Sequence, residues 1–151
     1  MFSKKALPFI FLLLSFTLSG QQMTHFDSLS SVLEAYYELN IKVFQENSTV
    51  ADIDSIFNLF TEDFTYVHSK YGGTYSREDL YNGYVRNQKA GGYDGSVADI
   101  KVLNKITGLN AIAVVKRFIE RDDNGNLTDG EDQMAVFEFR NGQISRITEY
   151  W

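Results

Sequence analysis

The fold is decided by the stretch FEFRNGQISRITEYW, residues 137–151. Runs of aromatic and β-branched residues lie on both sides of Asn141-Gly142, and an Asn-Gly pair between such runs is the strongest short signal for a β-hairpin. Residues 133–140 and 143–151 are therefore predicted to form two antiparallel strands joined by a two-residue turn.

The register of this hairpin follows from the turn, because Arg140 then pairs with Gln143 and each later pair follows by counting. Glu138 is expected opposite Ser145, and Met134 opposite Glu149. Alternate residues of a strand share a face. One face of the predicted hairpin consists of Met134, Val136, Glu138, Ile147, Glu149 and Trp151. Both faces are apolar enough to predict that neither is covered by water alone.

Three further segments extend this pattern toward the N-terminus. β-Branched and aromatic runs bounded by glycine or by polar residues are typical of strands, and the Gly72-Gly73 pair permits a tight reversal after the first of them. The predicted strands are residues 64–68, 97–106, 112–121, 133–140 and 143–151.

Three helices are predicted before the long strands. Apolar residues at spacings of three and four indicate an amphipathic helix over residues 28–46, with Asp27 or Ser28 as its cap. Pairs of the form Ser/Thr-x-x-Asp introduce two shorter helices. These pairs are Thr49 with Asp52 and Ser76 with Asp79, and the helices are expected to end near Thr61 and Gly91.

The order of these elements predicts an α+β protein in which three N-terminal helices pack in a strongly curved antiparallel sheet. A sheet that curls around helices tends to leave a hollow. The expected shape is therefore a cone with an internal pocket.

The N-terminus has the form of an export signal. Lys4 and Lys5 precede an apolar run from Ala6 to Leu18, which is shorter than the roughly 20 residues that a membrane-spanning helix needs. We expect residues 1–20 to be a signal peptide and residues 21–151 to form one secreted or periplasmic domain, without stable membrane insertion after cleavage. An uncleaved N-terminal anchor is the alternative.

Composition excludes several classes of function. The formal net charge is −6 and no basic run follows Lys5, which disfavours nucleic-acid binding. With no cysteine and two histidines a zinc site is not expected. Residues 120–131 fit much of a calcium-binding loop, but the segments on both sides read as strands, whereas that loop requires helices. A solvated hairpin connection is the favoured interpretation, with calcium binding as the alternative.

Together, the element order, the segment LFTEDF at residues 59–64 and the terminal stretch resemble the nuclear transport factor 2-like superfamily. Its relatives include SnoaL-like polyketide cyclases, dehydratases and steroid isomerases. The resemblance covers essentially the whole chain after the signal. It implies a cone-shaped fold that admits a small, largely apolar molecule, frequent homodimers, and no requirement for a cofactor.

The resemblance also assigns candidate site residues. His68 falls where the steroid isomerases carry their catalytic base, although the family residue is a carboxylate. Ile147, Glu149 and Trp151 match positions that face the pocket in those enzymes. Tyr36 and Tyr37 resemble the tyrosine that donates to the oxyanion, with core packing as the alternative.

Strand geometry supplies the remaining candidates. Tyr66 shares a face with His68, so it is expected to line the pocket, whereas Asp63 points the other way. Glu138 and Glu149 would both lie on an apolar wall, where burial favours the protonated form that can act as an acid. The alternative is an ion pair of either carboxylate with Arg117.

Two functions remain open at this point. The first is proton transfer on a bound small molecule, in the manner of an isomerase, dehydratase or cyclase, with His68 as general acid or base and Glu138 or Glu149 as its partner. The second is a non-catalytic ligand-binding or dimerisation module of the cell envelope.

Overall fold

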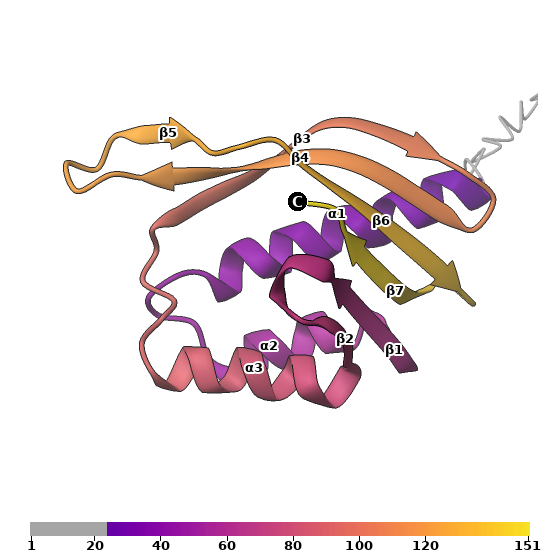
Figure 1. Ribbon diagram of the computed structural model, residues 1–151, viewed down its shortest axis with the longest axis horizontal. Coiled ribbons are helices and arrows are strands. Elements are labelled where there is room, and N and C mark those ends of the chain that lie inside the picture. Colours follow the sequence, from indigo (N-terminus) through magenta and orange to yellow (C-terminus); the bar gives the residue numbers. More distant parts are fainter. Residues whose placement is uncertain (1–23) are drawn as a thin grey trace, which may run out of the picture.

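The computed structural model describes residues 24–151. The predicted signal peptide lies outside the described residues. Within these residues, three α-helices and seven β-strands form the fold (Figure 1). The three helices and five of the strands follow the predicted order, and two short strands, at residues 73–76 and 127–129, were not predicted. The helices are α1 (His25–Val43), α2 (Val50–Phe57) and α3 (Arg77–Lys89), with a short 3₁₀ turn at Ser69–Tyr71. The strands are β1 (Phe60–His68), β2 (Gly73–Ser76), β3 (Val97–Thr107), β4 (Ala111–Arg121), β5 (Leu127–Asp129), β6 (Gln133–Arg140) and β7 (Gln143–Glu149).

Local capping explains where the helices begin. The predicted pair Ser76 and Asp79 forms a reciprocal capping box at the start of α3. Helix α1 begins earlier than expected, because Thr24 caps it and Asp27 returns the bond as the third helical residue. Each box satisfies backbone N–H groups that would otherwise lack partners at a helix start.

The sheet is mixed rather than antiparallel throughout. Its order is β2-β1-β7-β6-β4-β3, with β5 paired to β4. Strands β1 and β7 run parallel. Short turns force consecutive strands to be antiparallel, but β1 and β7 are far apart in sequence and no turn fixes their relative direction. The prediction of an antiparallel sheet was therefore wrong for this one pair.

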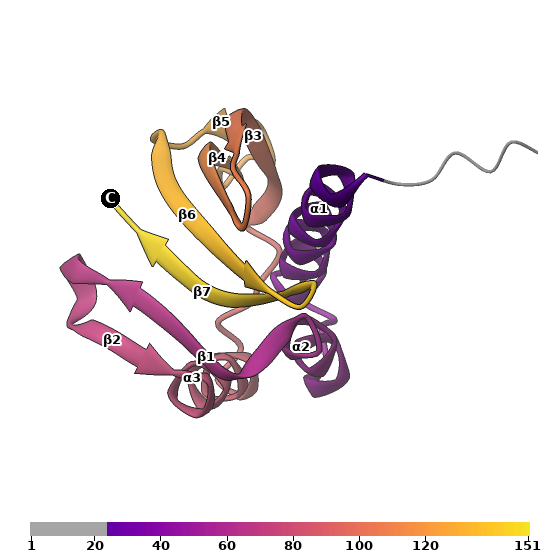
Figure 2. The ribbon, with the colours of Figure 1, turned by 90° about the vertical axis from the view of Figure 1, so that its right-hand side faces the viewer.

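The predicted curvature is confirmed. Figure 2 shows the sheet bending from the β2–β1 end to the β3–β4 end. Helix α1 packs against β3, β4 and α2, while α3 packs against β1 and α2. Phe137 of β6 is completely buried, and its ring meets the rings of Tyr36 and Tyr37 of α1 edge-on. The core thus joins α1 to the centre of the sheet.

The terminal hairpin contains a β-bulge that the sequence reading did not predict. Asn141 and Gly142 both have positive φ, as a two-residue hairpin turn requires, and Arg140 pairs with Gln143 as predicted. Ser145 is then an extra residue in β7, so Glu138 opposes Arg146 and Phe137 opposes Ile147. A bulge exchanges the faces of every residue beyond it. The prediction was therefore wrong in how it combined the two strands. Ile147 and Glu149 lie on the inner face as expected, but beside Phe137 and Ala135 and not on one face with Glu138 and Met134.

Residues 120–131 form the connection from β4 through β5. Asp122 accepts backbone hydrogen bonds from Asn124 and Asn126, which closes a tight turn between the two strands. This segment lies between strands and not between the helices that a calcium loop needs. Within residues 24–151, no group of three or more His, Cys, Asp or Glu side chains is placed to hold a metal ion. The described part of the chain also has no helix that is both long and apolar enough to span a bilayer.

Candidate ligand-binding cavity

A cavity in two parts opens between the sheet and α3. The part that we call the inner chamber has a volume of about 170 Å³, and the outer chamber has a volume of about 350 Å³. Tyr66, Leu80, Tyr84 and Trp151 line both chambers. The inner chamber is also lined by Tyr36, Tyr37, Asn40, Phe44, Ile100, Lys116, Phe118 and Glu149. Shared walls make the two chambers one continuous candidate site.

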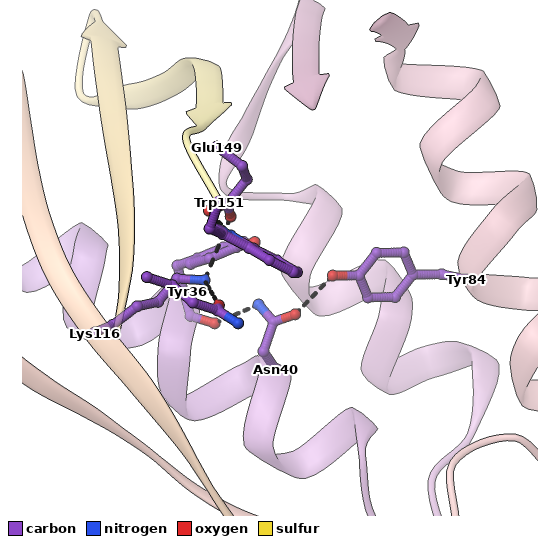
Figure 3. Close-up of polar contacts among 7 residues, drawn as sticks. Tyr36, Asn40, Tyr84, Lys116, Glu149 and Trp151 are labelled. Carbon is purple, nitrogen blue, oxygen red and sulfur yellow. Dashed lines mark hydrogen bonds and ion pairs between the residues drawn. The ribbon is translucent and has the colours of Figure 1, made fainter. Parts of the chain in front are cut away.

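The inner chamber contains a buried polar cluster, shown in Figure 3. The side chains of Lys116 and Glu149 are 4% and 6% exposed, and the Lys116 Nζ lies 3.4 Å from Glu149 Oε1. The Trp151 indole N–H donates to Glu149 Oε2 over 2.7 Å. Lys116 also donates to the Gln133 side-chain oxygen at 3.3 Å. Each carboxylate oxygen of Glu149 thus has a partner, as a buried charge requires.

The cation beside Glu149 is Lys116 and not Arg117. Arg117 projects from the opposite face of β4, where it forms ion pairs with Asp129 and Asp132. The prediction of Arg117 in the pocket was wrong because both faces of β4 are apolar and alternation alone does not select between them. The bulkier set, Ile112, Val114 and Phe118, shares the face of Lys116, and this difference in side-chain size was the available signal.

Two more predicted residues lie outside the cavity wall. Glu138 is half exposed on the outer face of the sheet, where its nearest cation is Arg146 at 3.9 Å, because the bulge reverses its face. The pocket placement of Glu138 was therefore wrong. Ile147 is fully buried on the inner face but packs in the core and lines neither chamber.

Tyr36 and Tyr37 lie both in the core and at the wall of the cavity. They pack in the core against Phe137, and they also line the inner chamber. Asn40, one turn further along α1, donates to the Tyr36 carbonyl and accepts from the Tyr84 hydroxyl at 2.7 Å. Burial raises the pKa of Tyr36 and of Tyr84 well above the ordinary value. These phenols therefore act as neutral hydrogen-bonding groups.

His68 lies at the boundary between the core and the outer chamber. Its side chain is almost fully buried, and its ring contacts Trp151 at a centroid distance of 4.6 Å and Tyr71 at 4.5 Å. In the parallel pair of β1 with β7 it is the register partner of Glu149. Among residues 24–151 neither ring nitrogen has a hydrogen-bond partner. His68 thus keeps an unused donor and an unused acceptor, both buried, next to the outer chamber.

Charge and burial keep the His68 ring neutral. Burial is the largest cause that lowers its pKa below 6.5, and Lys70 and Lys116 lower it further, whereas Glu149 acts in the opposite direction. Asp63, which was expected to point away from His68, is exposed and pairs with Arg140. Within residues 24–151, no carboxylate is hydrogen-bonded to the imidazole.

The lowered pKa of His68 predicts a loss of stability in mild acid. The unfolded chain binds the proton more readily than the folded one, so the free energy of unfolding is fully present above about pH 6.5 and falls below it, by up to about 1.4 kcal/mol per pH unit. Urea unfolding between pH 7.5 and 5 measures this slope. The pH slope of the unfolding free energy should become smaller in His68→Phe and stay unchanged in the control His25→Gln. An unchanged slope in His68→Phe would assign the effect to other groups.

No protein-family model matches the sequence, and no curated protein matches it. The fold does match solved structures. An NTF2-like protein from Anabaena variabilis aligns with a TM-score of 0.57 over 85% of this chain and 93% of that one, at 15% identity. An NTF-2 like protein of unknown function from Burkholderia xenovorans aligns at 0.56 over 82% of both chains, at 18% identity.

This chain has the nuclear transport factor 2-like fold. The three helices and the curved mixed sheet agree with it. TerC, co-crystallised with polyporic acid, has a similar structure, with a TM-score of 0.54 over 82% of this chain and 91% of that one, at 16% identity. Identities this low establish the NTF2-like fold alone, so the function must be argued from the cavity.

Proposed function

We propose that this protein is an exported pocket protein that binds a small, largely apolar molecule and acts on it by proton transfer, with His68 as general acid or base. The observation that carries the proposal is the His68 imidazole, which has no hydrogen-bond partner among residues 24–151, at the wall of an aromatic-lined cavity. Buried polar groups normally find a partner. A bound ligand would supply the partner that His68 lacks among the described residues.

The walls of the cavity support a ligand that is mainly apolar. Aromatic rings of Tyr66, Tyr84, Tyr93 and Trp151 surround the outer chamber, and the polar side chains of His68, Asp79, Arg86 and Asn87 lie among them. Such sites fix a ligand by apolar contact and orient it with a few polar groups. The similar structure of TerC, co-crystallised with polyporic acid, gives a precedent for a small organic ligand within this fold.

Export and dimerisation belong to the same proposal. The paired lysines and short apolar run at the N-terminus favour export to the periplasm or the exterior. An apolar patch on the outer face of the sheet favours a homodimer. It combines Ile106, Met134 and Val136 with Ala113 and Val115, and its Ile106 and Met134 are 71% and 44% exposed.

A non-catalytic binding module is the second candidate. It is favoured by one observation, namely that no described side chain hydrogen-bonds to His68 and orients its ring. General acids and bases are usually held by such a neighbour. The two candidates make the same prediction for binding and differ in whether the bound molecule is converted.

An NMR pH titration of both histidines tests the proposal, with and without a panel of small hydrophobic ketones and sterols. His68 should titrate below its ordinary pKa, and its signals should shift when a ligand enters the outer chamber. His25 is the internal control, because it bonds to the Leu109 carbonyl and lines neither chamber. If no compound moves the His68 signals, the proposed pocket function fails.

A further inference from the structure

The proton-transfer proposal leaves the amine of Lys116 without a role. This amine lies in the wall of the inner chamber, at the end of the cavity that His68 does not reach. Its side chain is 4% exposed, and its Nζ lies 4.9 Å from the centre of the Phe118 ring and 5.7 Å from that of Trp151. The amine is thus surrounded by aromatic rings, one carboxylate and the Gln133 side-chain oxygen.

This environment suits an amine that reacts as a nucleophile. A lysine reacts with a carbonyl carbon only when its amine is neutral, and an apolar pocket favours the neutral form. Burial lowers the pKa of Lys116, and Glu149 partly opposes the effect. Surface lysines such as Lys101 on β3 are exposed to water and have no comparable enclosure.

We propose that Lys116 forms an imine with the carbonyl carbon of a small aldehyde or ketone held in the two chambers. The inference rests on the proposed function, because it requires that the cavity admits a ligand. It deepens that function by naming the class of compound and the atom that would bond to it.

Lys116 and Glu149 together supply and take back every proton that imine formation needs. Lys116 gives one proton to Glu149, its neutral nitrogen attacks the carbonyl carbon, and a proton moves from nitrogen to oxygen to give a carbinolamine. The Glu149 carboxyl then protonates the hydroxyl group, the C–O bond breaks and water leaves. The product is a protonated imine paired with the Glu149 carboxylate, and no oxidant or reductant takes part.

The distances fit this exchange of protons. Glu149 Oε1 faces the Lys116 Nζ at 3.4 Å, while Oε2 is held by the Trp151 indole N–H at 2.7 Å. The carboxylate therefore keeps one oxygen directed at the amine. Trp151 acts here as a positioning residue, because it touches Glu149 and sets the orientation of that carboxyl group.

Reductive trapping tests the inference. The purified protein is incubated with benzaldehyde and sodium cyanoborohydride at neutral pH, and the mass of the intact protein and of its peptides is followed over time. We expect one benzyl group to be added first at Lys116, about ten times faster than at Lys101, because a desolvated amine is the more reactive one. Labelling that is no faster at Lys116 than at Lys101 would overturn the proposal.

Three variants test the roles of the Lys116 amine and of the Glu149 carboxyl group separately. Lys116→Arg keeps a cation beside Glu149 but forms no stable imine, so the early label should disappear while far-UV circular dichroism stays unchanged. Glu149→Gln keeps an acceptor for Trp151 and removes the acid, so labelling of Lys116 should slow. Lys101→Arg is the matched control and should leave the label on Lys116 intact.

The same compound distinguishes this inference from the function on which it rests. If benzaldehyde shifts the His68 signals and Lys116 stays unlabelled, the pocket is real and the imine is excluded. If benzaldehyde neither shifts His68 nor labels Lys116, the imine is excluded as well, and the ketone and sterol panel then decides the pocket function separately.

Discussion

Replacing Lys116 with methionine should lower the free energy of unfolding by about 3–5 kcal/mol, which is the usual cost of breaking a buried ion pair from one side. The loss comes less from the missing attraction than from the partner that remains. Glu149 would be left without its cation at 6% exposure, with the Trp151 indole N–H as its remaining hydrogen-bond donor. Urea denaturation at pH 7 measures the change.

Arg117 provides the matched control for this substitution. It is the next residue of β4, but it faces outward and pairs with the half-exposed carboxylates of Asp129 and Asp132. Surface pairs of this kind contribute about 0–1 kcal/mol, so Arg117→Met should change stability by no more than that. Equal losses in the two variants would contradict the burial of the Lys116–Glu149 pair.

A double variant tests whether the unpaired Glu149 carboxylate causes the loss of stability. Lys116→Met combined with Glu149→Gln removes both charges and keeps an oxygen that accepts from Trp151. Because no unpaired charge is then left in the inner chamber, most of the lost stability should return. A double variant as unstable as Lys116→Met alone would show that packing of the lysine stem, and not the stranded charge, determines the loss.

Replacing Phe137 with alanine should cost about 3–5 kcal/mol, since large-to-small changes at buried aromatic sites remove transfer free energy and leave a cavity. The Phe137 ring is fully buried at the point where β6 meets α1. Phe26→Ala is the control, because the Phe26 side chain is 50% exposed. Its cost should stay within about 0.5 kcal/mol, and a similar cost at both sites would contradict the assigned core.

The elements that could be predicted from the sequence are those with local causes. The Ser76–Asp79 pair defines the start of α3 through a bond between neighbours, and Asn141-Gly142 defines the turn through backbone preference alone. Both signals lie within a few residues of the structure that they specify. They were sufficient to identify the order of elements and the fold.

The candidate site was only partly predictable, because its residues are brought together by packing between segments that are far apart in the sequence. Ser145 becomes a bulge through the packing of β7 against β1 and β6, and no local signal marks it. That one residue moved Glu138 from the pocket to the surface. Lys116 was missed for a related reason, since a charged residue within an apolar strand appears suited to the exposed face until the depth of the cavity is known.

The position of β7 has a consequence for the order in which the sheet folds. Strand β7 is last in the chain order, yet it lies between β1 and β6. The side chain of Gln143, in β7, donates a hydrogen bond to the Phe60 carbonyl, 83 positions earlier in the sequence. The helices hold the two halves of the sheet on one core, but no strand pairs with both halves until β7 is in place. Pairing over such sequence distances is slow. The edges of β1 and β6 therefore stay unpaired until β7 docks between them, and the sheet is completed late in folding.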